Sequence, residues 1–463
     1  MHQSHWFEDA VAAEAGDPAP VFEGDIRPDV CIVGGGFTGL WTAINLKKHE
    51  PSLDVVLLEA DACGSGASSR NAGFLVHMWP KFPDLEKTFG TDEALRIGRA
   101  SAQAVDDILD LCTAHNIDIQ HQAVGWLWGS TNETQSGHWT SIMDSLERHQ
   151  VYPFQYLGKA EMADRTGSDA YVDGVLDSGV GSIQPGRLVR GLRRVALEAG
   201  VRIFEHSAMT RLDRSRPPIV HTAGGQVRAG KVVLALYAWT LGIRELRPSL
   251  VVLGTDAVAT EPISDLIEEA GFAKAPAIND SRTFVQFIRT SADGRVVFGK
   301  AGGALPFGAN LGTDFQKPGR SVDQLRNEIL GDAYPQFMNA PVARTWSGPI
   351  ERTKSGLPLF GTLSTCPDIC YGFGYSGNGV LPSVLGGRIL ASLALGRNDE
   401  WSNCGLVRPA PYSFPPEPIR YFGGLMVRAA ILRKDRLENE NRPVDLVTRG
   451  LAAFAPGSFK PTS

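Results

Sequence analysis

Short apolar runs alternate with helical patterns near the start of the chain. Residues 30–33 form an apolar, β-branched run, which predicts a strand. Apolar side chains then recur at helical spacing from Leu40 to Leu46, and Pro51 ends this pattern before a second apolar run at 55–58. The order strand, helix, strand predicts a βαβ unit and therefore a parallel sheet.

The rest of the body mixes both periodicities, which favours an α/β fold with two interlocked domains. Helices are predicted at 84–117, 138–149, from Pro185 to Gly200, and at 322–337. Strands are predicted at 124–128, 201–205, 231–236, 251–259, 283–289 and 295–299, followed by a glycine-rich strand and helix at 369–395.

The pattern changes after Leu395. Five prolines fall between 409 and 418 and predict a linker. A basic amphipathic helix is expected beyond it, with apolar Phe422, Leu425, Met426, Ala429 and Leu432 beside basic Arg420, Arg428, Arg433, Lys434 and Arg436. Such a helix can lie on an anionic membrane surface. Packing on the body or on a second subunit is the interpretation we prefer.

Composition narrows the class of protein. The 463 residues are 43% hydrophobic and 21% charged, and the net charge of −6 argues against nucleic acid as a partner. The six cysteines form no C-x-x-C pair and no zinc-type spacing, so we predict free thiols and no metal site. The N-terminus lacks signal-peptide character, and no apolar run approaches the ~18 residues of a membrane span. We expect a cytoplasmic protein.

The turn after the first strand has the spacing of a phosphate-binding loop. Gly34 permits the tight turn, Gly36 lets the backbone approach a pyrophosphate, and Gly39 lets the helix pack closely on the sheet. The helix N-terminus then offers free N–H groups to the phosphates. Glu59 ends the second strand, 20 residues after Gly39, where a carboxylate can accept hydrogen bonds from ribose hydroxyls.

A second motif follows the second strand directly. Residues 64–73 are rich in glycine and small hydroxyl side chains, which allow a loop to lie flat along a diphosphate. Arg70 adds a positive charge beside the diphosphate or the flavin ring. This loop favours FAD over NAD or NADP.

These residues resemble the D-amino-acid oxidase superfamily of FAD-dependent oxidoreductases, and are most similar to its γ-glutamylputrescine oxidase-like branch. The resemblance covers most of residues 28–397, with matching segments at 33–40, 57–60, 66–73, 232–239, 259–262 and 372–380. It implies an FAD-binding Rossmann-like domain with a parallel sheet, plus a smaller α+β substrate domain with a mainly antiparallel sheet. The implied cofactor contacts are Gly34, Gly36, Phe37, Thr38, Gly39, Glu59, Ala60, Ser68, Ser69, Arg70, Asn71, Ala72, Gly73, Met209, Ala235, Trp239, Gly374, Tyr375, Ser376, Gly377, Asn378, Gly379 and Val380.

The last of these segments feeds a helix that begins near Val380. In the family, the N-terminus of that helix points at the pyrimidine edge of the flavin, where its dipole stabilises the reduced, anionic ring. The resemblance also implies domain limits. We predict an FAD-binding domain at 25–83, 152–245 and 341–400, a substrate domain at 84–151 and 246–340, and a linker with helix and tail at 401–463.

Several positions depart from the family pattern. Covalent relatives attach FAD through a His near Arg70 or a Cys shortly before Gly356, but Asn71 and residues 346–351 supply neither, which implies noncovalent FAD. Sarcosine-type relatives hold the α-carboxylate of the substrate with an Arg and a Lys, where this chain has Gly73 and Leu381. The oxygen-activating lysine of those relatives would fall near Val297. Lys300, three residues on, would face the other side of a strand.

Four side chains are candidates for the substrate pocket. His77 could accept a proton or bind an anion, Tyr375 should lie near the flavin ring, and Arg289 and Lys300 could bind an anionic group. Core packing for His77 and Tyr375, and solvated charge for the other two, are the alternatives. Flavin chemistry does not require a diagnostic base.

The preferred function is oxidation of the C–N bond of a primary or secondary amine to an imine, with O₂ as electron acceptor and H₂O₂ as product. An amino-acid or 2-hydroxy-acid dehydrogenase that passes electrons to a quinone is one alternative. A flavin-binding subunit of a larger assembly is another.

Overall fold

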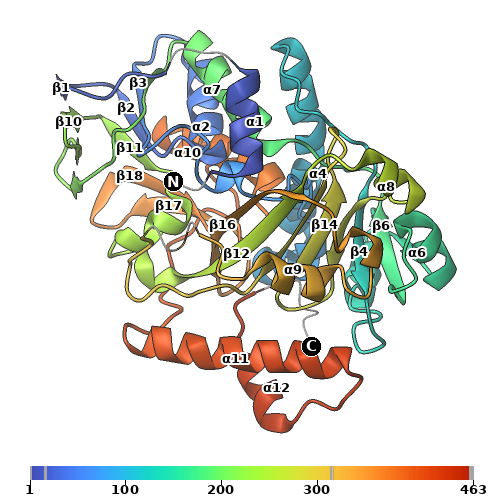
Figure 1. Ribbon diagram of the computed structural model, residues 1–463. Coiled ribbons are helices and arrows are strands. Elements are labelled where there is room, and N and C mark those ends of the chain that lie inside the picture. The colour runs from blue at the N-terminus through green and yellow to red at the C-terminus, as the bar shows by residue number, and fades with distance from the viewer. Residues whose placement is uncertain (1–2, 15–17, 313–314, 316, 458–463) are drawn as a thin grey trace.

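The computed structural model describes residues 3–14, 18–312, 315 and 317–457, which form three sheets with helices around them (Figure 1). The expected α/β fold, with one largely parallel and one largely antiparallel sheet, is confirmed. The two larger sheets meet at the cavity described below.

The parallel sheet contains the predicted βαβ unit. Its order is β17-β18-β11-β2-β3-β7, with only β17 antiparallel to its neighbour. The strands are β2 (Val30–Val33), β3 (Val55–Leu58), β7 (Arg202–Phe204), β11 (Lys231–Leu234), β17 (Leu359–Leu363) and β18 (Cys366–Phe373). Every residue of β2 and β3 is buried, which explains their unbroken apolar runs. Helices α2 (Phe37–His49), α7 (Pro185–Glu198) and α10 (Val380–Ala394) pack beside this sheet (Figure 1).

The second sheet has eight strands in the order β16-β12-β15-β14-β13-β4-β6-β5, and is antiparallel apart from the β13–β4 pair. They are β4 (Trp126–Ser130), β5 (Gln155–Leu157), β6 (Asp173–Asp177), β12 (Leu250–Thr260), β13 (Ala277–Asp280), β14 (Gln286–Thr290), β15 (Val296–Ala301) and β16 (Val342–Thr353). Strands β5, β6 and β16 fall in ranges that we assigned to the FAD domain. Their ladders, β6 with β4, β5 with β6, and β16 with β12, place them in the eight-stranded sheet.

The remaining elements are shorter or peripheral. A four-stranded sheet joins β1 (Gly24–Ile26), β10 (Gly225–Arg228), β9 (Ile219–His221) and β8 (Arg211–Asp213). The predicted helix 84–117 is two helices, α3 (Phe82–Phe89) and α4 (Thr91–Ala114), because Gly90 adopts φ = 82° between them. The other helices are α5 (Thr140–Glu147), α6 (Lys159–Thr166), α8 (Ser264–Glu269) and α9 (Val322–Ile329), with 3₁₀ turns at Ala67–Ser69, Trp79–Lys81, Tyr237–Gly242, Arg247–Ser249 and Pro335–Phe337.

An N-terminal helix, α1 (His5–Ala13), was not predicted. Ser4 caps it by accepting from Phe7 N, and donates to the carbonyl of Ser69 at 2.5 Å. The buried Trp6 packs edge-on against Trp346 of β16. The helix therefore contacts both the loop that contains Ser69 and the eight-stranded sheet.

The predicted C-terminal helix is α11 (Ile419–Asn439), followed by α12 (Leu446–Ala452). Both lie along the lower edge of the molecule in Figure 1. Ala430 and Ile431 are buried against Leu253 and Ala301 of the eight-stranded sheet. The helix therefore packs on the body, as we preferred, but not through the predicted apolar face, since Phe422, Met426 and Ala429 of that face are exposed. Within the described ranges, no helix is long and apolar enough to cross a membrane.

Candidate active site

A cavity of about 900 Å³ lies between the parallel and the eight-stranded sheets. Its lining comes from the turn after β2, the end of β3, residues 64–72, the start of α10, and the inner face of strands β12 and β16. This volume is within the range of sites for a cofactor or drug-sized ligand.

The glycine turn shapes one end of the cavity. Gly34 has φ = 113°, and a Cβ added there would come within 2.4 Å of the Ala235 carbonyl oxygen. At Gly39, a Cβ would come within 1.9 Å of the Gly34 carbonyl oxygen. Only glycine fits both positions. The turn is therefore held tight, and α2 begins at the wall of the cavity.

Glu59 closes the same end from the tip of β3. Its carboxylate accepts from Gly35 N at 2.7 Å and from Asp61 N at 3.0 Å. Burial raises the pKa of Glu59, while the N–H groups of Asp61 and Gly35 act in the opposite direction. A carboxylate has about four acceptor sites, so two remain for ligand hydroxyls.

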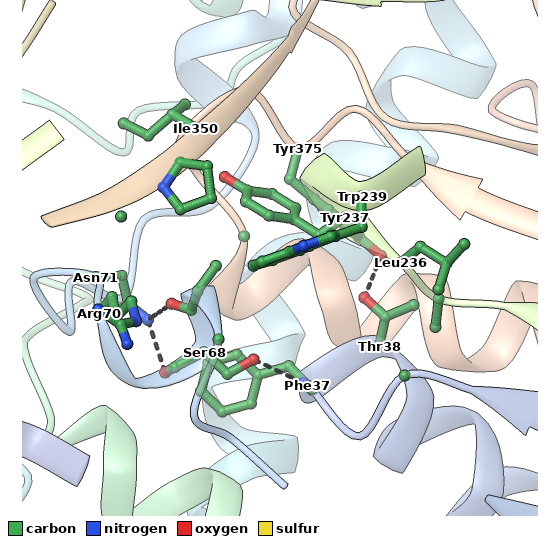
Figure 2. Close-up of a pocket in the computed structure, with 18 of the residues that line it drawn as sticks. Phe37, Thr38, Ser68, Arg70, Asn71, Leu236, Tyr237, Trp239, Ile350 and Tyr375 are labelled. Carbon is green, nitrogen blue, oxygen red and sulfur yellow. Dashed lines mark hydrogen bonds between the residues drawn. The ribbon is translucent and has the colours of Figure 1, made fainter. Parts of the chain in front are cut away.

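The loop of residues 64–73 forms another wall of the cavity and is fixed by hydrogen bonds (Figure 2). Ser68 Oγ accepts from Phe37 N at 2.9 Å, which ties the loop to the start of α2. Asn71 Nδ2 donates to the carbonyls of Ala67 and Ser68. The buried Arg70 donates to Ser65 O and Ser347 O, at 2.9 and 2.8 Å. Burial lowers its pKa, which Asp61 partly opposes.

The segment before α10 forms another part of the wall. The N–H groups of Gly374 and Tyr375 donate to Glu351 Oε1, at 2.6 and 3.2 Å. Tyr375 Oη and Thr38 Oγ1 lie 2.8 Å apart, so this segment meets the glycine turn (Figure 2). Glu351 is fully buried, and burial raises its pKa to about 8. Glu351 thus holds the turn that directs the N-terminus of α10 at the cavity.

Most predicted cofactor residues line this one cavity. They are Gly34, Gly36, Phe37, Thr38, Glu59, Ala60, Ser68, Arg70, Asn71, Ala72, Met209, Ala235, Trp239, Tyr375, Ser376, Gly377, Asn378, Gly379 and Val380. Gly39, Ser69, Gly73 and Gly374 stand behind the wall. Ser69 Oγ donates to Gly64 O, and Gly73 adopts φ = 73° beside the Ile183 carbonyl, so these residues shape the loops.

Three of the four substrate candidates point elsewhere, which corrects the pocket assignment. His77 is buried and its Nε2 contacts the Asp177 carboxylate. Arg289 donates to the carbonyls of Ala72 and Ile183 and lies 5.1 Å over the Trp6 ring. Lys300 pairs with Glu328 at 2.6 Å.

The reason is local in each case. The strand alternation of β15 turns Ala301 toward the cavity and Lys300 away from it. Arg289 is held by the carbonyl groups of Ala72 and Ile183, to which it donates. Burial lowers the pKa of Arg289 to about 9. Tyr375 alone of the four lines the cavity.

The eight-stranded sheet supplies lining residues that sequence patterns did not reveal. Ala257, Phe287 and Ile350 form an apolar wall, and Arg352 adds a charge at its edge. None of the described residues that line the cavity is a His or a Cys. The sequence from Gly348 to Arg352 is compatible with a strand. It does not show which alternate residues of that strand face the cavity.

The site and the parallel sheet together define a dinucleotide-binding oxidoreductase fold. The model of the FAD dependent oxidoreductase family (DAO) matches residues 29–393, and the chain belongs to this family. The resemblance inferred from the motifs is thereby confirmed, and the chain is an FAD-dependent oxidoreductase.

Individual proteins agree with this membership. Gamma-glutamylputrescine oxidoreductase of Escherichia coli (strain K12) is 32% identical over 409 residues, which cover 87% of this chain and 92% of the relative. The crystal structure of glycine oxidase from Geobacillus kaustophilus superposes with a TM-score of 0.68 at 22% identity, over 82% of this chain and 98% of that one. L-proline dehydrogenase from P. horikoshii gives 0.65 at 18% identity, over 85% and 100%. The two structures show the fold alone.

Proposed function

We propose that this protein binds FAD noncovalently and oxidises the C–N bond of a primary or secondary amine to an imine, which water converts to an aldehyde and an amine. One observation carries the proposal: a single cavity runs from the glycine turn to the apolar wall of the eight-stranded sheet. Cofactor and substrate can therefore lie in contact within it.

The lining residues fit FAD by their chemistry. The positive end of the α2 dipole suits a diphosphate, and Glu59 suits a ribose. The N-terminus of α10 suits the pyrimidine edge of the flavin, because its dipole favours negative charge. When bound, FAD supplies the electron chemistry, since its ring accepts the electron pair lost by the amine.

Noncovalent binding is supported by the lining itself. Asn71 occupies the loop position at which covalent relatives have a His, and its amide is engaged with Ala67 and Ser68. Ile350 lies in the segment where other relatives have a Cys. His77 follows the loop, but it is held against Asp177 outside the cavity.

The substrate side orients an amine and excludes water. Ala257, Phe287 and Ile350 provide apolar surface, and an amine surrounded by such side chains favours its neutral, reactive form. The family relative named above is an oxidoreductase of gamma-glutamylputrescine. An amine substrate is thus consistent with the wall and with the relative.

The structure gives less support for a particular electron acceptor than for an amine substrate. Lys300 is bonded to Glu328 and faces away from the cavity, so it is not placed to assist a reaction with O₂. This observation favours keeping a quinone as a second candidate acceptor. The same FAD site would then serve an amino-acid or 2-hydroxy-acid dehydrogenase.

Anaerobic mixing with a panel of amines, amino acids and 2-hydroxy acids tests the proposal. We expect an amine to bleach the yellow flavin absorbance, and subsequent exposure to O₂ or to a soluble quinone will identify the acceptor. Bleaching by a 2-hydroxy acid alone would favour the dehydrogenase. Bleaching by none of the panel would favour a flavin-binding subunit.

A further inference from the structure

A small crevice adjoins the cavity beyond Tyr375. The crevice and the cavity share four lining residues, Arg352, Tyr375, Ser376 and Asn378. Met78, Lys81, Gly356, Pro358 and Pro382 complete the crevice and do not line the cavity. The crevice therefore lies next to the cavity, and these four residues line both spaces.

Arg352 is the cation at the junction. It follows Ile350 by two residues on β16, so both side chains leave the strand on the cavity face. The side chain is 7% exposed. Within the described ranges, its guanidinium donates one hydrogen bond, 3.3 Å to the Gly457 carbonyl, and forms no ion pair. A guanidinium has five N–H donors, so Arg352 can still donate to an anion in either space.

Lys81 brings a second positive charge to the same crevice. A Cβ on Gly356 would lie 3.0 Å from Lys81 Nζ and 2.7 Å from the Gly457 oxygen that Arg352 contacts, so both cations approach one point. Burial lowers the pKa of Lys81 to about 8, with Arg352 adding to the effect and Asp84 opposing it. None of the described residues that line the crevice is acidic.

The surroundings are also electropositive. Pro382 belongs to the first turn of α10, whose dipole has its positive end there. The carboxylate of Glu351 lies on the other face of β16, where it accepts from Gly374 and Tyr375. An anion in the crevice would thus meet Arg352, Lys81 and a helix N-terminus, with no carboxylate among the described residues of the wall.

We propose that this crevice binds a carboxylate of the substrate that is several bonds away from the amine being oxidised. The inference rests on the proposed amine oxidation. It follows from position, because Arg352 lines both the cavity and the crevice, whereas Lys81 lines the crevice and not the cavity. Since Lys81 does not line the cavity, a carboxylate that meets both cations would be separated by several bonds from an amine held in the cavity.

A chain-length series tests the proposal in the FAD-bound enzyme. The series runs from glycine through γ-aminobutyrate and δ-aminovalerate to ε-aminocaproate, with n-pentylamine as the uncharged comparison, and the readout is anaerobic flavin reduction. We expect one of the longer amino carboxylates to half-saturate the enzyme at a concentration at least about tenfold below that of n-pentylamine, because each charge-assisted bond contributes about tenfold or more.

Variants locate the effect. Arg352→Gln and Lys81→Gln should bring the ratio of the two half-saturating concentrations toward one, and Arg352→Lys should restore part of it. Lys354→Gln is the matched control, since Lys354 is exposed on the turn after β16 and lines neither space. Flavin content and thermal unfolding of each variant report whether it has folded.

Glutarate, which cannot be oxidised, gives a readout that needs no turnover. Binding of glutarate should change the flavin absorbance of the parent and of the Lys354→Gln variant. The dissociation constant from this change should be at least about tenfold larger in Arg352→Gln. A preference that peaks at glycine, or a preference that survives Arg352→Gln, would overturn the crevice assignment while leaving amine oxidation intact. Reduction by no amine at all would instead refute the proposed function.

Discussion

Glu59→Gln is expected to weaken FAD binding through the ribose of the adenosine half. The two carboxylate oxygens already accept from Gly35 N and Asp61 N, at 2.7 and 3.0 Å. Alanine would leave both N–H groups without an acceptor and would disturb the turn as well as the ligand site. Glutamine keeps the shape of the side chain and one acceptor oxygen, so it is the sharper change.

The size of the effect follows from counting acceptor sites. A carboxylate has about four, and two remain for ribose hydroxyls after the backbone is satisfied. In the Glu59→Gln variant the amide oxygen can accept from one N–H and one hydroxyl, so one ribose hydrogen bond to a charged group is lost. Such a bond contributes about 1.5–3 kcal/mol. Its loss should make the FAD dissociation constant roughly 10- to 150-fold larger.

Titration of the flavin-free protein with FAD and with FMN measures this directly. FMN lacks the adenosine half, so Glu59→Gln should change the FAD dissociation constant at least about tenfold more than the FMN constant. An equal loss for both ligands would show that the substitution damaged the glycine turn generally. An unchanged FAD constant would refute the ribose assignment.

Four further outcomes are expected. Acid precipitation should release all flavin into the supernatant, and yellow colour in the pellet would disprove noncovalent binding. Sarcosine, glycine and D-alanine should reduce the flavin at least about 100-fold less efficiently than the best amine without an α-carboxylate, because Gly73 and Leu381 donate nothing to that group; stopped-flow comparison decides, and rapid turnover of sarcosine would show that another basic residue holds it. Burial raises the pKa of Glu351 from 4.5 to about 8, so the folded flavin-free protein holds a proton there that the unfolded chain releases; its stability should fall by up to about 1.4 kcal/mol per pH unit between those values, and urea unfolding of Glu351→Gln should lack this slope. Ile431→Ala should weaken the contact of α11 with the body by about 2–5 kcal/mol and speed proteolysis of that helix, whereas unchanged cleavage would contradict the packing.

The elements that were predicted correctly are those whose pattern is local. Strands 30–33 and 55–58 are apolar on both faces, and the helix between them begins at a glycine turn, so neighbouring residues determine the structure. Strand β16 was not predicted, because it is defined by a ladder with β12, which lies far away in the sequence. Helix α1 was missed because contacts with distant parts of the chain stabilise it: it packs on α7, where Arg187 pairs with Asp9, and its Trp6 packs against Trp346 of β16.

The site divides in the same way. Backbone geometry makes the glycine turn, so its spacing in the sequence was sufficient to find it. In the sequence, Arg352 is one of several neighbouring charged residues, and nothing there marks it as part of the site. The structure identifies it, because Arg352 and Lys81 line the same crevice. Lys300 shows the converse, since its strand was predicted while its pairing with Glu328 depends on the distant helix α9.

His77, Arg289 and Lys300 were chosen as reactive types of side chain, and each is bonded to another part of the protein. That outcome is physically reasonable for a flavin enzyme, because the cofactor accepts the electrons and the protein chiefly has to bind, orient and exclude water. Selectivity then depends on which side chains the strands of the substrate sheet direct inward. On β16 these are apolar at Ile350 and cationic at Arg352, two residues apart on one face. Substitution at Arg352 should therefore change which amine is oxidised, whereas substitution at Glu59 should change only how tightly FAD is held.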